Sequence, residues 1–248
     1  MNIFLRISYD GSGFNGFQRQ SPTLKIRTIQ AELERELSRI LCERIKIYGS
    51  GRTDAGVHAI GQAVNFKIKN LKIPLEKIKL LLNRALKNEI FIRDIYEVSD
   101  DFHSRYSAKS KLYLYWIKRG PVQPWLRNYC WFWGDRNEWK MDRINKAASL
   151  FIGEHDFSGY SVRLEKGLST RREIFGIDVT GDEYDLKIAF HGSGFLRCMV
   201  RVLTSAIISH GCDLISLENL KRQLDLPGSV NLPPKAPPNG LYLVNVNY

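Results

Sequence analysis

The chain has 248 residues, with 37 lysines and arginines against 26 aspartates and glutamates, a net charge of +11 and a pI near 9.5. Its 44% apolar and 25% charged residues are ordinary for a globular protein and suffice for one large domain or two small ones. No apolar run is long enough for a membrane span, nothing resembles a signal peptide, and the four cysteines (Cys42, Cys130, Cys198, Cys212) form no C-x-x-C pair, so we expect a cytoplasmic protein with reduced thiols.

The basic excess is spread over the whole chain. Up to Arg105 there are 18 basic against 12 acidic residues, and after it 19 against 14. A charge excess in both halves favours a broad binding surface for a polyanion, and nucleic acid is the partner we expect. The alternative is a basic protein with no such partner.

The N-terminal stretch from Asn2 to Tyr9 is predicted to be a strand. It runs into the polar, glycine-rich loop DGSGFNGFQRQ at residues 10–20. A phosphate-binding glycine loop is the generic alternative, but the sequence G-x-x-x-x-G-K-[ST] of nucleoside triphosphate sites is absent.

Two amphipathic helices are predicted in the first half. Thr28 caps the first, and Pro74 begins the second. Their apolar positions at helical spacing are Ile29, Leu33, Leu37, Ile40 and Leu41, then Ile78, Leu81, Leu82, Ala85 and Leu86. Charged residues, including Glu34 and Glu36, are expected on the solvent side.

A short charged loop, GSGRTDAGVH at residues 49–58, lies between two predicted strands, Ile45–Tyr48 and Gln62–Ile68. Its three glycines permit a tight turn, and loops on a rigid scaffold often carry reactive groups. The alternative for Asp54 is that it only caps the turn. His58 could order this loop or transfer a proton, and we favour the ordering role.

Further strands are predicted at Ile90–Tyr96, Lys109–Ile117, Arg172–Thr180, Tyr184–His191 and Gly240–Val246, with a hairpin around Gly181-Asp182. Helices are predicted at Asp142–Ile152 and Phe195–Leu203, and a structural turn at residues 153–160. Arg201 lies in the second helix among apolar residues, where a buried charge needs a partner.

Several stretches resemble the TruA family of tRNA pseudouridine synthases. They are GSGRTDAGVHAIGQ (49–62), YDGSGFNGFQRQ (9–20), DFHSRYSA (101–108), GEHDFSGY (153–160), GFLRCMVR (194–201) and GLYLVNV (240–246). The resemblance runs from the first strand to the last. It implies an α+β fold of two RRM-like halves with adjoining antiparallel sheets flanked by helices, and an active site in the cleft between them. We place the boundary after Arg105, giving domains 1–105 and 106–248.

The resemblance also assigns roles to residues. Asp54 would be the catalytic residue, as nucleophile or as base. Arg52 would fill the space left by the flipped nucleotide, Tyr113 would stack on the target base, and Arg201 would pair with Asp54. Tyr115 lies on the same face of the strand as Tyr113, and only the alignment chooses between them. Arg197 stands where relatives often have histidine, so its role is open.

The implied reaction is the isomerisation of uridine to pseudouridine in the anticodon stem-loop of tRNA, at positions thirty-eight to forty, by a homodimer. This reaction involves no redox change, so no cofactor and no metal are expected. Two other classes of protein fit parts of the sequence. A non-catalytic RNA-binding protein would leave Asp54, Arg52 and Arg201 unexplained. A glycoside hydrolase or nuclease would normally need a second carboxylate or metal ligands, and the stretches 9–20, 49–62 and 194–201 offer only Asp10 besides Asp54.

Overall fold

The computed structural model describes residues 1–21, 26–134, 138–162, 167 and 169–248. Contacts divide the chain into two compact units. Unit 1 comprises Met1–Lys109 with Tyr242–Tyr248, and unit 2 comprises Ser110–Leu241. The domain boundary after Arg105 stays a prediction.

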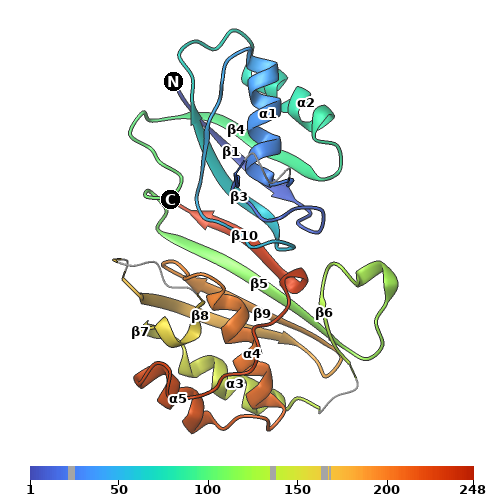
Figure 1. Cartoon of the computed structure of the whole chain (residues 1–248), viewed down its shortest axis with the longest axis vertical. Helices are drawn as coiled ribbons and strands as arrows, with labels where there is room; N and C mark the ends of the chain where they lie inside the picture. The colour runs from blue at the N-terminus through green and yellow to red at the C-terminus, as the bar shows by residue number, and fades with distance from the viewer. Residues whose placement is uncertain (22–25, 135–137, 163–166, 168) are drawn as a thin grey trace. The chain divides into compact units, whose positions relative to one another are not determined.

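Unit 1 is a sheet with two helices. Its elements are β1 (Asn2–Tyr9), α1 (Ile29–Leu41), β2 (Ile47–Gly49), β3 (His58–Lys67), α2 (Leu75–Ala85), β4 (Ile90–Val98) and β10 (Leu241–Asn247). Strand β1 lies between β3 and β4, antiparallel to both. On β3, β2 pairs antiparallel near Phe66 and β10 pairs parallel at His58. Helices α1 and α2 lie together over the sheet (Figure 1).

The core of unit 1 follows the predicted periodicities. Leu33 and Leu37 of α1 and Ile78 and Leu82 of α2 are fully buried, as expected for helices that cover a sheet. Thr28 caps α1 by accepting a hydrogen bond from the Ala31 amide at 3.3 Å.

The expectation for Glu34 and Glu36 on this helix was wrong, because both are buried. Glu34 accepts hydrogen bonds from the Ile47 amide and from Gln30 Nε2, each at 3.0 Å, and is paired with Arg19. Glu36 is paired with Arg35 and Arg39. These partners offset the cost of burying the carboxylates, and Glu34 ties α1 to the start of β2.

Unit 2 is a second sheet covered by helices. Its elements are β5 (Ser110–Arg119), β6 (Trp131–Gly134), α3 (Met141–Leu150), β7 (Gly153–Asp156), β8 (Arg171–Gly181), β9 (Asp185–Gly192), α4 (Met199–Gly211) and α5 (Leu217–Asp225). The strand order is β5-β9-β8-β7, antiparallel throughout, and β6 pairs parallel with β5. The predicted hairpin is β8–β9, and α3 packs against α4 and α5.

The two units share a chain order. Unit 1 runs β1-α1-β2-β3-α2-β4, and unit 2 runs β5-α3-β8-β9-α4 with β6, β7 and α5 added. The first is the complete β-α-β-β-α-β motif, and the second repeats its first five elements. The predicted α+β class with two similar halves is therefore confirmed. That the two sheets adjoin, with an active site in the cleft between them, stays a prediction.

Some elements of unit 2 differ from expectation. Helix α4 begins at Met199 rather than Phe195, because Cys198 takes a left-handed conformation with φ of 59°. Residues 153–156 form strand β7 instead of a turn, and β6 and α5 were not predicted. Within the residues described, no helix combines the length and hydrophobicity needed to cross a membrane.

Candidate functional site

The loop that carries Asp54 joins β2 to β3 in unit 1 and lies directly against the loop of residues 10–20. The Phe17 amide donates to the Thr53 carbonyl oxygen at 3.1 Å. Gly16 has φ of +90°, and a Cβ there would lie 2.8 Å from the Thr53 oxygen and 3.3 Å from the Asp54 carbonyl carbon. At Gly11 a Cβ would lie 2.0 Å from the Val57 oxygen. Glycine is required at both positions because the two backbones touch there.

Hydrogen bonds from side chains of β1 and β3 fix the Asp54 loop. Ser50 Oγ bonds Gln62 Oε1 at 2.6 Å, and Gln62 Nε2 donates to the Gly51 oxygen at 3.1 Å. Thr53 Oγ1 lies 2.8 Å from the Tyr9 hydroxyl. Burial raises the pKa of Tyr9 to about 12, so the hydroxyl keeps its proton at neutral pH. The loop is thus held by a buried polar network on β1 and β3.

Asp54 occupies the turn of this loop and is half-buried between Thr53 and Val57, which are 7% and 2% exposed. The turn is closed by the backbone, since the Val57 amide donates to the Asp54 carbonyl oxygen at 3.2 Å. Arg52 is exposed, and its Nη1 donates to Gln18 Oε1 at 3.1 Å. Asp54 and Arg52 therefore belong to one ordered loop, at the junction of the two motif stretches.

His58 is 3% exposed at the start of β3. Its Nδ1 accepts from the Gly11 amide at 3.1 Å and lies 3.3 Å from Asp10 Oδ1, while its ring stacks on Tyr242 at 4.9 Å. These contacts agree with the ordering role favoured for His58.

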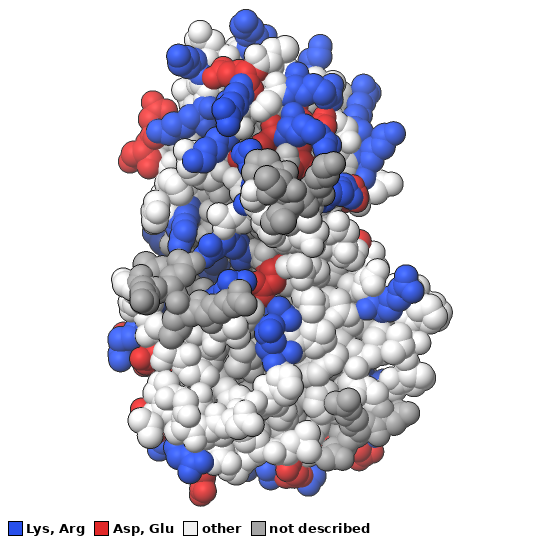
Figure 2. Space-filling view, viewed as in Figure 1, with Lys and Arg blue, Asp and Glu red and all other residues white. Residues whose placement is uncertain are grey.

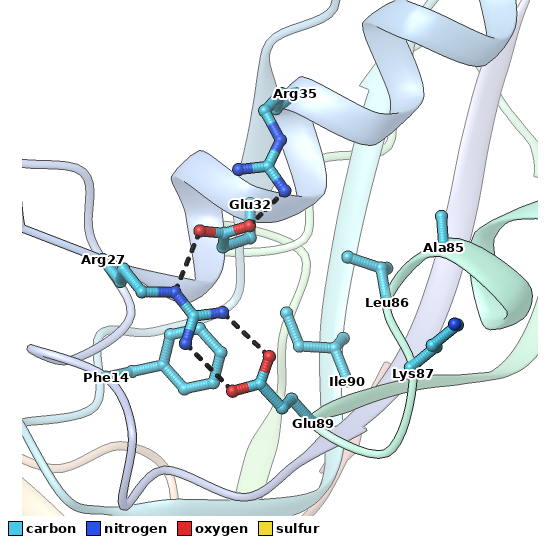
Figure 3. A pocket seen from close by; sticks show the side chains of 9 residues that line it. All are labelled: Phe14, Arg27, Glu32, Arg35, Ala85, Leu86, Lys87, Glu89 and Ile90. Carbon is cyan, nitrogen blue, oxygen red and sulfur yellow. Dashed lines mark hydrogen bonds and ion pairs between the residues drawn. The ribbon is translucent and has the colours of Figure 1, made fainter.

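An ion-pair network around Arg27 also holds the loop of residues 10–20 (Figure 3). Arg27 donates from Nη1 and Nη2 to the two Glu89 oxygens at 3.0 and 2.8 Å, and from Nε to Glu32 at 3.2 Å. Its guanidinium lies 4.8 Å from the centre of the Phe14 ring. The hydrogen bonds from Arg27 lower the pKa of Glu89.

Backbone bonds connect this network to the loop. The Asp10 amide donates to the Glu89 oxygen at 3.0 Å, and the Asn15 amide donates to the Arg27 oxygen at 2.9 Å. The small pocket beside the network, drawn in Figure 3, is lined by Arg27, Glu32, Arg35, Lys87, Glu89 and apolar neighbours. Its two arginines are already paired with carboxylates, so we assign it a structural role. Sequence reasoning did not single out Arg27 or Glu89, because they are 62 residues apart.

In unit 2, Tyr113 and Tyr115 lie on the same face of β5, as predicted, but in different surroundings. Tyr113 is 8% exposed, and the ring of Phe195 meets it edge-on at 5.2 Å. Tyr115 is fully buried, and its hydroxyl donates to the Pro237 oxygen at 2.6 Å. Burial raises the pKa of Tyr115 well above its usual value, and the nearby charge of Arg201 opposes that shift only in part.

Arg201 is the third residue of α4 and is 8% exposed. Its Nε donates to the Ala236 oxygen at 2.7 Å, and the Ala236 amide donates to the Arg201 oxygen at 3.1 Å. Arg201 and Tyr115 therefore hold two consecutive carbonyls, those of Ala236 and Pro237. The attachment of this proline-rich loop to Arg201 was not predicted from the sequence.

The four predicted site residues fall into two pairs. Asp54 and Arg52 share the β2–β3 loop of unit 1, whereas Tyr113 and Arg201 lie on β5 and α4 of unit 2. The pairing of Arg201 with Asp54 stays a prediction. Phe195 is the aromatic neighbour of Tyr113 that sequence reasoning missed, because it was placed in a helix instead of the turn before α4.

Comparisons with known proteins give one consistent answer. A family model described as tRNA pseudouridine synthase matches residues 6–107 and 147–248. The tRNA pseudouridine synthase A of Dictyoglomus thermophilum is 39% identical over 251 residues, covering all of both chains. The protein of the same name from Thermoanaerobacter sp. (strain X514) is 34% identical over 248 residues, covering 100% of this chain and 99% of its own.

One further relative and one solved structure complete the comparison. The tRNA pseudouridine synthase A of Listeria monocytogenes serotype 4b is 39% identical, covering 98% of this chain and 97% of its own. A crystal structure of a Cbf5-Nop10-Gar1 complex covers 83% of this chain and 54% of that chain at 14% identity. Its TM-score of 0.36 is too low to bear on fold or function.

Proposed function

The chain belongs to the tRNA pseudouridine synthase family, and from that premise we propose that it isomerises uridine to pseudouridine in the anticodon stem-loop of tRNA, at positions thirty-eight to forty. The observation that carries the proposal is the Asp54 loop. Its carboxylate-bearing turn is fixed by the Tyr9, Ser50 and Gln62 network and by the backbone of residues 11–17.

The proposed reaction breaks the bond between the ribose and the uracil nitrogen and forms a bond to a uracil carbon, so nothing is gained from solvent. It needs a positioned carboxylate, a pocket that keeps the free base and exclusion of water. Asp54 acts as nucleophile, or as a base that generates a glycal intermediate. Both roles use the ionised carboxylate, which a neighbouring cation favours. Arg201 is the cation proposed for this purpose.

The target base must leave its stack to be reached, at a cost of a few kcal/mol. Arg52 lies two residues before Asp54, is exposed, and donates a hydrogen bond to Gln18. These features support the proposal that Arg52 fills the space that the flipped base leaves. Tyr113 is proposed to stack on the captured uracil. Tyr115 fits that role poorly, because its ring is fully buried and its hydroxyl is bonded to Pro237.

The same proposal includes a homodimer that works in the cytoplasm. The net charge of +11, spread over both halves, supports a tRNA partner because phosphates must be neutralised over a long contact. The alternative of a binding protein without activity leaves the closely fixed Asp54 loop without a purpose.

The test is to incubate the protein with unmodified tRNAs and to map pseudouridine at single-nucleotide resolution. We expect new pseudouridine confined to positions thirty-eight to forty. Asp94→Asn is the matched control for Asp54→Asn. Asp94 is a partly exposed carboxylate of β4, paired with Arg6 at 3.4 Å. Pseudouridine at other positions only would overturn the proposed site in tRNA, and its absence from every tRNA tried would overturn the activity.

A further inference from the structure

A row of aromatic and basic side chains lies on the surface of unit 1. The ring of Tyr48 lies 5.1 Å from that of His103, and the ring of His103 lies 4.5 Å from that of Tyr106. Lys46 lies over the Tyr48 ring at 5.3 Å, and Arg105 lies over the Tyr106 ring at 6.0 Å. We call these five residues the Tyr106 patch.

Both tyrosine rings of the patch, on either side of His103, are open to solvent. Tyr106 is 78% exposed and Tyr48 is 37% exposed. Such exposure of large aromatic rings is costly unless the rings have a partner, and solvent-facing aromatic clusters mark interaction sites.

Residues 102–104, which lead into Arg105 and Tyr106, are fixed by contacts with other residues of unit 1. Phe102 packs against Phe4 and Tyr248 at 5.8 and 4.8 Å, and its carbonyl oxygen accepts from Asn2 Nδ2 at 2.9 Å. Ser104 is fully buried, and its amide donates to Asn65 Oδ1 at 2.9 Å.

The ring of His103 is also fixed, since its Nδ1 accepts from the Arg105 amide at 3.1 Å. The segment and the His103 ring are therefore ordered before any partner binds, which lowers the entropic cost of binding.

The charges of the patch distinguish it from the helical face of the same unit. On α1, Arg35 and Arg39 are paired with Glu32 and Glu36, and Figure 2 shows acidic and basic side chains mixed over the face with α1 and α2. Lys46 and Arg105, by contrast, have no ion-pair partner among the residues that the structure describes. A polyanion therefore gains more at the Tyr106 patch than at the paired arginines of α1.

We propose that the Tyr106 patch is a binding surface for tRNA nucleotides other than the one being modified, with an unpaired base stacked on Tyr106 and phosphates met by Arg105 and Lys46. Exposed aromatic rings interleaved with cations are the chemistry by which proteins hold unpaired nucleotides. The proposal rests on the proposed function, because it takes tRNA as the ligand.

The position of Tyr48 allows one RNA molecule to contact both the Tyr106 patch and the Asp54 loop. Tyr48 lies on β2, six residues before Asp54, so the chain between them spans at most roughly 20 Å. A few nucleotides of an RNA strand cover that distance. The patch would then help to place the tRNA without touching the reacting uridine.

The test measures affinity and chemistry separately. For Tyr106→Ala we expect the Kd for unmodified tRNA to rise about 5- to 100-fold, the value of one base stacked on an aromatic ring. For Tyr106→Phe, which keeps the ring, the Kd should change less than about twofold. The single-turnover rate at saturating tRNA should stay at the wild-type value in both variants. Arg105→Ala should reduce the salt dependence of the Kd by about one phosphate contact.

Tyr184→Ala is the matched control, because Tyr184 is 59% exposed with Arg119 over its ring at 5.9 Å, but it lies in the β8–β9 hairpin of unit 2. Its Kd for tRNA should not change. Melting curves check that each variant is folded, and sedimentation checks its oligomeric state.

The outcomes separate this proposal from the proposed function. An unchanged Kd for Tyr106→Ala overturns the patch, and so does a loss of self-association with tRNA affinity intact, which would make it a contact between two copies of the chain. A lower rate at saturating tRNA would place Tyr106 in the active site instead. If the wild-type protein binds tRNA through Tyr106 but forms no pseudouridine, the patch stands and the proposed function fails.

Discussion

At the scale of single residues, the account depends on how each side chain of the candidate site is held. Asp54 is half-buried after the buried Thr53, and its turn is closed by a backbone bond to the buried Val57. Tyr113 and Arg201 are both nearly buried, so substitutions there affect the fold as well as the chemistry. Tests at this scale must therefore report stability and rate separately.

Tyr113 is predicted to act by stacking on the target base. Stacking is worth ~1–3 kcal/mol by alanine substitution, so we expect Tyr113→Ala to lose between roughly fivefold and 160-fold in single-turnover rate. Tyr113→Phe should retain the rate, because only the hydroxyl is lost. A loss in Tyr113→Phe as large as that in Tyr113→Ala would make the hydroxyl essential and contradict the stacking role.

Tyr115→Phe is the control for this pair. It removes the bond to the Pro237 oxygen, so we expect a loss of about 0.5–1.5 kcal/mol in the free energy of unfolding with little change in rate. Tyr115→Ala is unsuitable, because it would empty a fully buried site. A rate that falls more at Tyr115 than at Tyr113 would show that the alignment chose the wrong tyrosine.

Arg201 is predicted to serve both the fold and the site. Arg201→Ala leaves the Ala236 carbonyl without its donor at 2.7 Å, which should cost about 1–3 kcal/mol in the free energy of unfolding. If Arg201 also pairs with Asp54, turnover should fall at least about tenfold, and Arg201→Lys should restore part of it because the charge remains. A stable Arg201→Ala variant with normal turnover would remove Arg201 from both roles.

At the scale of elements, the sequence predicted what local pattern controls. Strand β1 agrees with the prediction at both ends, and the cap at Thr28 was identified correctly because capping chemistry is local. Helix α2 begins at Leu75, one residue after the predicted start at Pro74. The start of α4 was wrong because the left-handed conformation of Cys198 has no sequence signal. The burial of Glu34 was missed because its partner, the Ile47 amide, comes from a strand 13 residues away.

The candidate site shows the same limit. The Asp54 loop could be identified from its sequence, but its contact with Gly16 and Gly11 depends on the packing of two distant loops. Gly16 and Gly11 were visible only as members of a motif. Both positions require glycine for a steric reason, which becomes visible only when the positions of the Thr53 and Val57 carbonyls are known.

This contact gives a test at the element scale. Gly16→Ala puts a Cβ 2.8 Å from the Thr53 oxygen at φ of +90°, so we expect a loss of about 1–3 kcal/mol in stability and a clear fall in single-turnover rate as the Asp54 loop shifts. Gly13→Ala is the control in the same loop, because its Cβ would meet only side-chain atoms at van der Waals distance, Glu89 Oε1 at 3.5 Å and Arg27 Nη1 at 3.9 Å. Equal effects of the two substitutions, or none in Gly16→Ala, would contradict the proposed coupling of the loops.

At the scale of the whole molecule, the basic excess and the repeated β-α-β-β-α order describe a protein suited to a large polyanion. The described residues bring together no group of three His, Cys, Asp or Glu side chains that could hold a metal ion. Because the basic excess is spread over both halves, binding to tRNA is expected to depend strongly on ionic strength.

We predict that activity falls steeply as salt rises, because each phosphate contact releases counterions. Activity should survive a strong chelator once the tRNA has been correctly folded. The measurement is the initial rate across a salt series, with and without chelator, on tRNA refolded beforehand. Loss in chelator that a divalent ion restores, with the tRNA fold unchanged throughout, would indicate a metal-dependent step.

The most direct test of the central claim is Asp54→Asn, which keeps the size of the side chain and removes its charge. Single-turnover conversion on unmodified tRNA and the Kd for the same tRNA are measured side by side. We predict that no pseudouridine forms and that the Kd stays within a few-fold of wild type, because basic residues in both halves hold the RNA. Conversion at even a tenth of the wild-type rate would show that Asp54 is not the catalytic residue.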